Sequence, residues 1–357
     1  MSKAHKGQTQ DAPHPRRVMP WGDLPRSEQQ AESGLILVDK DQNVTSHDVV
    51  GAMRRLAGTR KVGHGGTLDP MATGLLTVGI GRATKLLTYL SGCEKQYRAT
   101  VCLGAATNTE DADGEIITPT AEQRKRLEQI TTFEIDAAIA GLTGEIMQVP
   151  SSFSALKVDG KRSHELARAG AEVHLAARPV TIESFRRLSQ PIYHSELFKF
   201  PVLTFDVEVK CSAGTYIRAL ARDLGAALEV GAHLRMLRRT QVRGWNVRQA
   251  SSVAEYAQLI RRGEQLPVIS IHELCRSLFP IVEITAAEAQ LLQNGQFIPY
   301  RTAAQTNPPM LGQTKMAAAF TAEGKAIAVI SKRGAFYKPD LQLVESSCIN
   351  QSCNFAE

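Results

Sequence analysis

The segment from residue 203 to residue 228 places the tightest constraint on the fold of this chain. Its first part alternates strictly between apolar and polar side chains, with the apolar set Leu203, Phe205, Val207, Val209 and Cys211. A period of two predicts a strand with one buried face. Leucine and isoleucine then recur at helical spacing from Ile217 to Leu228. Thr215 is the expected N-cap of that helix. Tyr216 and Arg218 would then lie in its first turn, at the carboxyl end of the strand.

Other segments repeat this mixture of strands and helices without βαβ regularity. Strands are expected at residues 35–38, 75–80, 97–103, 142–149, 316–320 and 325–331, and helices at 46–57, 83–90, 121–140 and 286–294. This order predicts an α+β protein. The 357 residues suffice for two domains. We expect a polar, disordered tail over residues 1–33, a main domain over 34–250, a small β-rich module over 279–345, and a second tail over 346–357.

Residues 63–74 hold a single carboxylate, Asp69, among four glycines, two threonines and a proline. Helix and strand interiors disfavour glycine and proline, so the segment is predicted to be a loop with a specified backbone. Loops on a rigid scaffold often carry catalytic groups. An aspartate before proline is also a common turn residue, and from the residues alone that structural role is favoured.

Phosphate and metal sites are less well supported. The segment lacks the G-x-x-x-x-G-K-[ST] order of a phosphate loop, and no strand–turn–helix unit surrounds it as a dinucleotide site requires. Asp111-x-Asp113-Gly114 is too short for a calcium loop. The six cysteines show no C-x-x-C spacing, which argues against zinc and against a disulfide framework. We therefore expect reduced thiols and no metal. We also expect a cytoplasmic protein, because no apolar run is long enough to cross a bilayer.

The formal net charge is +6, and the basic residues are unevenly distributed. One group comprises Arg235, Arg238, Arg239, Arg243 and Arg248, and a looser one comprises Lys157, Lys161, Arg162, Arg168 and Arg178. Each group alone is equally consistent with a solvated face. Two separate groups favour contacts with a polyanion, such as the phosphates of a nucleic acid.

Several motifs occur together in the order typical of one enzyme family. Residues 63–76 are similar to the motif G-H-x-G-x-L-D-P-x-A-x-G-x-L, and residues 214–218 read G-T-Y-I-R. Further matches are Val38-Asp39-Lys40 with Thr45-Ser46, Lys95-x-Tyr97, Pro150–Gly170, and Ala232-His233 with Leu237-Arg238-Arg239. Over about residues 34–248 the chain resembles the TruB family of tRNA pseudouridine synthases. It departs from the family pattern at Asp41, Asn43, Gly65 and His164.

The resemblance implies a pseudouridine synthase fold, with a mixed, mainly antiparallel sheet and flanking helices. It also implies a T-arm-gripping insertion at about residues 145–180 and a PUA-like RNA-binding module at the C-terminus. Uridine 55 of the tRNA T-loop would be flipped out, its uracil detached, rotated and rejoined through ring carbon 5, without a cofactor. Asp69 would be the catalytic nucleophile, Arg218 its ionic partner, and Tyr97 the aromatic ring that stacks on the base.

The same resemblance implies a set of substrate-binding residues. These are His64, Tyr216, Leu237, Lys40, Lys157, Lys161, Arg238 and Arg239. tRNA is the expected partner, with a monomer acting without an obligatory protein partner. Two alternatives stay open: an RNA-guided relative that works within a ribonucleoprotein, and a tRNA-folding chaperone with secondary catalysis. The route of Asp69, through a ribose ester or through a glycal, is also open.

Overall fold

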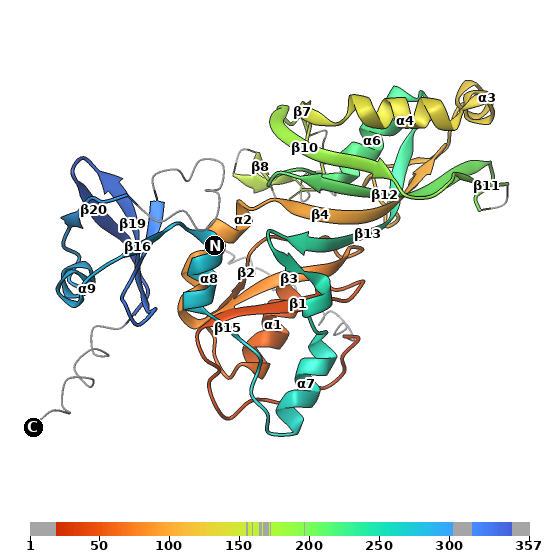
Figure 1. Ribbon diagram of the computed structural model, residues 1–357. Coiled ribbons are helices and arrows are strands. Elements are labelled where there is room, and N and C mark those ends of the chain that lie inside the picture. The colour runs from red at the N-terminus through yellow and green to blue at the C-terminus, as the bar shows by residue number, and fades with distance from the viewer. Residues whose placement is uncertain are drawn as a thin grey trace, which may run out of the picture.

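The computed structural model describes residues 19–302 and 316–344, apart from residues 155, 159, 164, 165, 167–170, 172 and 196. Two sheets organise these residues, a large one in the main domain and a smaller one near the C-terminus (Figure 1). The predicted tail over 346–357 and the departure at His164 lie outside the described residues.

The large sheet has eleven strands, with the path β15-β1-β3-β13-β4-β12-β10-β7. β2, β11 and β14 pair with β3, β12 and β13 beside this path. The bounds are β1 (Gly34–Lys40), β2 (Val62–His64), β3 (Thr73–Ile80), β4 (Lys95–Leu103), β7 (Gly144–Gln148), β10 (Arg178–Arg187), β11 (Ile192–His194), β12 (Val202–Cys211), β13 (Ala232–Val242), β14 (Trp245–Asn246) and β15 (Ile269–Ser270). Two short hairpins join β5 (Ala106–Thr107) to β6 (Ile116–Ile117) and β8 (Lys157–Val158) to β9 (Lys161–Arg162).

One parallel pair interrupts an otherwise antiparallel sheet. β3 and β13 run side by side in the same direction, with Arg238 opposite Thr73 and Arg239 opposite Gly74. Every other strand pair of the large sheet is antiparallel among the described residues. The mixed, mainly antiparallel sheet is therefore confirmed, and its parallel junction brings the start of β3 beside the middle of β13.

Helices cover the large sheet and flank its ends (Figure 1). They are α1 (Ser46–Leu56), the 3₁₀ helix η1 (Gly81–Leu86), α2 (Leu87–Ser91), α3 (Ala121–Gln129), α4 (Thr132–Gly141), α6 (Ile217–Ala227), the 3₁₀ turn η2 (Val247–Gln249) and α7 (Val253–Arg261). Thr45 caps α1 in a capping box with Asp48. The core joins the inner faces of α1, α6 and α7 to the sheet.

The C-terminal sheet has the order β16-β18-β19-β20-β17. Its strands are β16 (Ile281–Glu283), β17 (Ile298–Pro299), β18 (Met316–Phe320), β19 (Ala326–Arg333) and β20 (Phe336–Gln342), accompanied by α8 (Ile271–Leu278) and α9 (Ala286–Gln293). One apolar cluster contains Leu35 and Leu75 of the large sheet together with Phe279 and Phe320. The module is thus anchored to the main domain by a shared core.

Local differences from the sequence-based expectations have physical reasons. Residues 121–140 form two helices, because Thr131 caps a second helix at the point where Ile130 turns extended. Residues 83–90 begin as a 3₁₀ helix and continue as α2. Tyr216, not Thr215, is the N-cap of α6, and the Thr215 hydroxyl donates to the Ser212 carbonyl instead.

The expected disordered tail over residues 1–33 also differs from the structure. Residues 1–18 lie outside the described part, but Met19, Trp21 and Leu24 pack against the main core. Ser27 and Ala31 donate backbone hydrogen bonds to the carbonyls of Arg55 and Ala57 at the end of α1. Polar composition concealed these few apolar anchors.

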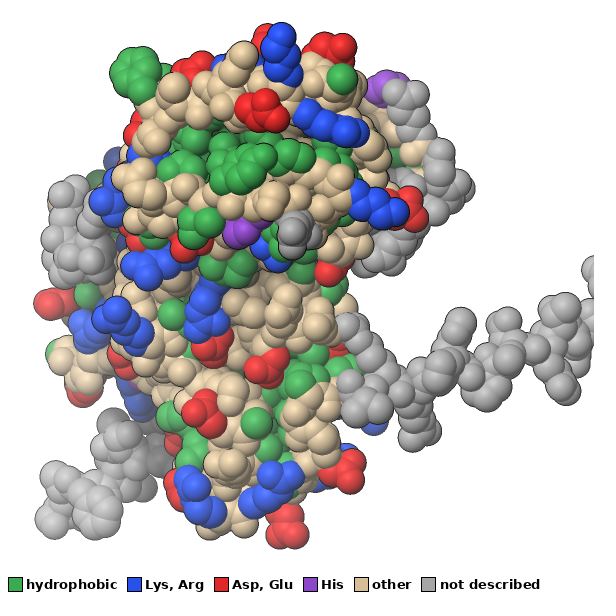
Figure 2. Space-filling view, turned by 90° about the vertical axis from the view of Figure 1, so that its right-hand side faces the viewer, with side chains coloured by type: hydrophobic (Ala, Val, Ile, Leu, Met, Phe, Trp, Pro, Cys, Tyr) green, Lys and Arg blue, Asp and Glu red, His purple; other side chains and the backbone are tan. Residues whose placement is uncertain are grey.

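Charges of both signs are mixed on the end of the molecule that carries α3 and β11 (Figure 2). Lys and Arg side chains lie among Asp and Glu side chains there, and a group of hydrophobic side chains occupies the upper half of the view. The positive net charge therefore does not form one continuous basic patch on this face.

Candidate active site

The Asp69 loop joins β2 to β3 and enters the sheet at its parallel junction. Gly74 has a φ of +99°, and a Cβ at this position would lie 2.2 Å from the Arg239 carbonyl oxygen. Only glycine permits this close approach of β3 to β13. The Ser46 hydroxyl donates to the Leu68 carbonyl and accepts from the Leu68 amide, which fixes the residue before Asp69 to the start of α1.

Lys40 holds the loop on its Pro70 side. Its side chain is fully buried, and its ammonium donates to the carbonyls of Asp41, Val44 and Pro70, the last at 3.3 Å. Burial lowers the pKa of Lys40 to about 8. Its charged end contacts three backbone oxygens away from solvent, and the predicted contact of Lys40 with substrate stays a prediction.

Asn43 stands one residue before Val44, at a position where the family pattern favours glycine. It adopts a left-handed φ of 64°, which asparagine tolerates better than most residues. Its backbone amide donates to the Pro70 carbonyl at 2.8 Å. The departure at this position therefore preserves the turn that supports the loop.

Arg239 holds the loop on its Gly66 side. The side chain is 1 % exposed, and its guanidinium donates to the carbonyls of Gly66, Thr67 and Leu75. The predicted contact of Arg239 with substrate stays a prediction, and in the structure its donors meet these buried carbonyls. The buried cations Lys40 and Arg239 thus bind backbone carbonyls at opposite ends of the Asp69 loop.

The Asp69 carboxylate meets Arg218 at the centre of the site. Arg218 lies at the start of α6, and its Nε is 2.9 Å from Oδ2 of Asp69. The two side chains differ in exposure, with 35 % for Asp69 and 5 % for Arg218. Sequence reasoning predicted this pair. The geometry leaves the carboxylate open to an incoming group while the cation that orients it is fixed in the interior.

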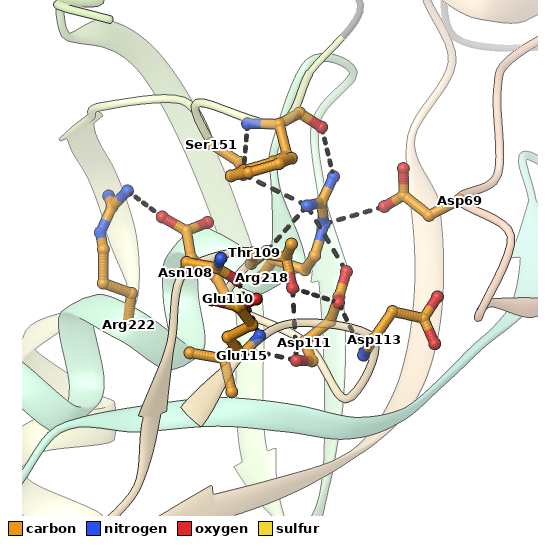
Figure 3. Close-up of polar contacts among 12 residues, drawn as sticks. Asp69, Asn108, Thr109, Glu110, Asp111, Asp113, Glu115, Ser151, Arg218 and Arg222 are labelled. Atoms are coloured by element: carbon orange, nitrogen blue, oxygen red, sulfur yellow. Dashed lines mark hydrogen bonds and ion pairs between the residues drawn. The ribbon is translucent and has the colours of Figure 1, made fainter. Parts of the chain in front are cut away.

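Acceptors from two separate segments surround the Arg218 guanidinium (Figure 3). Nη1 donates to the Thr109 carbonyl at 2.9 Å and to the Ser151 hydroxyl at 3.2 Å, and Nη2 donates to the Phe153 carbonyl at 3.0 Å. Oδ2 of Asp111 lies 3.5 Å from Nη1. Sequence reasoning missed this cage. Asp111 was the one residue with a visible signal, and there it was weighed only as part of a calcium loop.

The aromatic and histidine residues predicted for the site lie on different elements. Tyr97 of β4 is 7 % exposed, hydrogen-bonds with Arg239, and is close enough to Asp69 for the carboxylate to raise its pKa, although burial is the largest cause of that rise. His64 ends β2 and accepts from the Gly66 amide, and burial lowers its pKa. Tyr216 is half-buried, and its backbone is held by the Gln148 side chain. Their contacts with a base remain predictions.

Some arginines of the predicted basic groups form contacts within the protein, so they are not all available to bind a polyanion. Arg238 forms a two-pronged ion pair with Asp39, and Arg243 contacts Glu94 and the Ser277 carbonyl. Leu237 is buried in the main core, so its place on the pocket floor remains a prediction. The side chains of Lys157 and Lys161 lie outside the described part, although their backbones form the β8–β9 hairpin.

The described part of the chain offers no grouped metal ligands and no membrane-spanning helix. No group of three or more His, Cys, Asp or Glu side chains there could hold a metal ion. The helices there are too short or too polar to span a membrane. The cysteines described, Cys93, Cys102, Cys211 and Cys275, are free thiols.

Comparison with known families extends the geometric picture. Residues 54–217 match the model described as TruB family pseudouridylate synthase (N terminal domain). Residues 218–280 match the model described as tRNA pseudouridylate synthase B C-terminal domain. The boundary between the two matches falls directly before Arg218, so each contributes one member of the central ion pair.

Curated relatives match along most of their length. The chain is 47 % identical over 315 residues to the tRNA pseudouridine synthase B of Arthrobacter sp. (strain FB24), covering 88 % of this chain and 98 % of that protein. It is 48 % identical to that of Paenarthrobacter aurescens (strain TC1), covering 87 % and 94 %. The corresponding protein of Mycobacterium tuberculosis (strain ATCC 25618 / H37Rv) is 43 % identical, with coverage of 85 % and 93 %.

Solved structures share the fold at lower identity. A structure titled as a Cbf5-Nop10-Gar1 complex aligns with a TM-score of 0.61 and 22 % identity, covering 92 % of this chain and 91 % of that one. An archaeal box H/ACA sRNP Nop10-Cbf5 complex aligns with a TM-score of 0.61 and 21 % identity, covering 93 % and 94 %.

Proposed function

The chain belongs to the TruB family of pseudouridylate synthases, and from that premise we propose that it isomerises uridine 55 in the T-loop of tRNA, with Asp69 as nucleophile. It is a tRNA pseudouridine synthase and an isomerase. The observation that carries the residue assignment is the 2.9 Å contact between the half-exposed Asp69 carboxylate and the buried Arg218 guanidinium.

The reaction breaks the bond between ribose C1′ and uracil N1 and forms a bond between C1′ and C5. The proton on C5 is lost and N1 gains one, so no redox change accompanies the step. Asp69 acts in its ionised form, either by bonding to C1′ or by removing a ribose proton. Arg218 orients the carboxylate, because its guanidinium is fixed in the interior and its Nε lies 2.9 Å from Oδ2 of Asp69.

The base must leave the folded T-loop to reach Asp69, at a cost of a few kcal/mol. We assign the stacking surface for the flipped uracil to Tyr97, with Tyr216 and Leu237 beside it. His64 lies next to Gly66 of the same loop, and its lowered pKa favours a neutral imidazole that can enter the T-loop in place of a base. The enzyme acts in the cytoplasm as a monomer without an obligatory protein partner.

Replacing Asp69 by asparagine tests the assignment. The Asp69→Asn variant keeps the volume of the side chain but removes the nucleophilic oxygen anion, and its turnover is expected to fall by about 10,000-fold or more. The measurement is tritium release from tRNA labelled at uridine C5, combined with mapping of pseudouridine position. Retained turnover in Asp69→Asn would refute the role of Asp69.

Asp136→Asn is the matched control. Asp136 on α4 is also paired with an arginine, with 2.8 Å between its Oδ2 and Nη2 of Arg187, but it lies outside the site. Its turnover should equal that of the wild type.

A bare T-arm transcript should be modified without guide RNA or added protein. A requirement for either would favour the RNA-guided alternative, which the names of the similar relatives do not favour.

A further inference from the structure

Glu110 occupies a strained backbone position directly beside the Arg218 cage. Its φ is +65°, in the left-handed region that residues other than glycine and asparagine seldom adopt. Its two neighbours both face Arg218, since the Thr109 carbonyl accepts from Nη1 and the Asp111 carboxylate lies 3.5 Å from it. The left-handed turn at Glu110 therefore sets how the residues on either side of it, Thr109 and Asp111, approach Arg218.

Arg222 holds this turn from α6. It follows Arg218 by one helical turn, and its Nη1 is 2.6 Å from Oε1 of Glu110 (Figure 3). Its Nη2 donates to the Val149 carbonyl at 2.8 Å, two residues before Ser151. Arg218 and Arg222 thus bind the same two segments: Thr109 to Asp111 on one side, and Val149 to Phe153 on the other.

We propose that the Glu110–Arg222 ion pair is a positioning clamp for catalysis, which fixes the turn at Glu110 and thereby the orientation of Arg218 toward Asp69. This inference rests on the proposed function of the Asp69–Arg218 pair. Neither clamp residue touches the reacting atoms. Their effect is expected on the chemical step, because a misplacement of about 1 Å in a catalytic group can cost about 100-fold in rate.

Burial supports a role in positioning over a role in RNA binding. The Glu110 side chain is 12 % exposed, and its Oε2 has no hydrogen-bond partner within the described part of the chain. An unpaired buried charge is costly, so the ion pair with Arg222 is the main interaction that stabilises the Glu110 carboxylate. Arg222 also contacts Asp223, so its guanidinium is engaged on three sides.

Single-turnover kinetics on tRNA test the clamp. Arg222→Gln and Glu110→Gln should each lower the rate of the chemical step by about tenfold or more, while the KM for tRNA changes by less than about twofold. The double variant should be no slower than either single variant, because both remove the same interaction. Arg222→Lys should recover part of the rate, since lysine keeps the charge but cannot reach Glu110 and Val149 together.

Arg126→Gln is the matched control, because Arg126 and Glu134 form an ion pair of the same 2.6 Å length between α3 and α4. Its rate should be that of the wild type. Glu110→Gly separates positioning from stability, since glycine relieves the strained φ while the ion pair is lost. Its melting temperature should be preserved and its rate should fall as in Glu110→Gln.

Three results would overturn the clamp: an unchanged rate in Glu110→Gly, a change confined to KM, or additive losses in the double variant. Failure of the proposed function looks different. In that case the wild type itself would not modify tRNA, or Asp69→Asn would stay active, whatever the clamp variants do.

Discussion

The two sides of the Asp69–Arg218 pair are built in opposite ways. On the Asp69 side, buried cations hold backbone oxygens: Lys40 binds the Pro70 carbonyl and Arg239 binds those of Gly66 and Thr67. On the Arg218 side, backbone carbonyls, a hydroxyl and a carboxylate hold a buried cation. The first arrangement fixes a loop and leaves its carboxylate accessible. The second fixes the side chain itself.

The contrast follows from what each group must do. As the proposed nucleophile, Asp69 has to meet the ribose, so only its backbone can be fixed. Its partner has to hold one orientation, and each of the three guanidinium nitrogens of Arg218 contacts at least one acceptor. Preorganised charges of this kind stabilise a reacting group without reorganisation during the reaction.

The largest effect is expected from Arg218→Lys. An ammonium retains the charge but cannot reach Asp69, Thr109 and Phe153 at once, because it lacks the planar fork of the guanidinium. Turnover should fall by about 100- to 1,000-fold, or about 3–4 kcal/mol in the activation free energy, with little loss of stability. Rapid-quench measurement of pseudouridine formation checks this. A turnover within about threefold of the wild type would mean that charge alone suffices on this side.

The two sides also differ in how far the sequence reveals them. Asp69 and Arg218 lie in contiguous motifs with unusual glycine content, so both were predictable. Thr109, Ser151 and Phe153 were not, because two of them contribute backbone carbonyls and the third a single hydroxyl. No side-chain pattern marks such donors and acceptors. Their approach to Arg218 depends on long-range pairing between α6 and two distant segments.

Arg238 and Arg239 show a second limit. Neighbouring residues on a strand point to opposite faces, so one of the two had to face inward. The sequence does not reveal which arginine is buried, and a cluster of basic residues is most simply interpreted as surface charge. The fold was easier to predict, since the alternation of apolar and polar side chains at 203–211 depends on local chemistry alone.

A smaller effect, on stability, is expected from Arg239→Gln. Glutamine leaves at least two buried carbonyls without a donor, which should lower the free energy of unfolding by about 3 kcal/mol. Arg98→Gln is the control, because Arg98 is 61 % exposed and its 3.6 Å pair with Glu208 should contribute less than about 1 kcal/mol. Urea denaturation of both variants gives the comparison. Equal losses of unfolding free energy in the two variants would show that the buried contacts of Arg239 contribute no more to stability than an exposed ion pair.

The smallest effect is a pH dependence that only the Asp69 side should show. Burial lowers the pKa of Lys40 to about 8 from its ordinary value of 10.5. Between these values the folded protein has released a proton that the unfolded chain still holds, so the free energy of unfolding rises with pH in this window. Lys40→Met removes this contribution.

Urea denaturation at pH 8 and at pH 10 measures this contribution. The stability of the wild type relative to Lys40→Met should increase by about 1–2 kcal/mol between the two pH values. Lys95, whose pKa is also lowered to about 8, titrates in both proteins and cancels in the difference. Parallel curves would mean that the Lys40 ammonium keeps its proton through its three carbonyl contacts, and that the two sides are equally insensitive to pH.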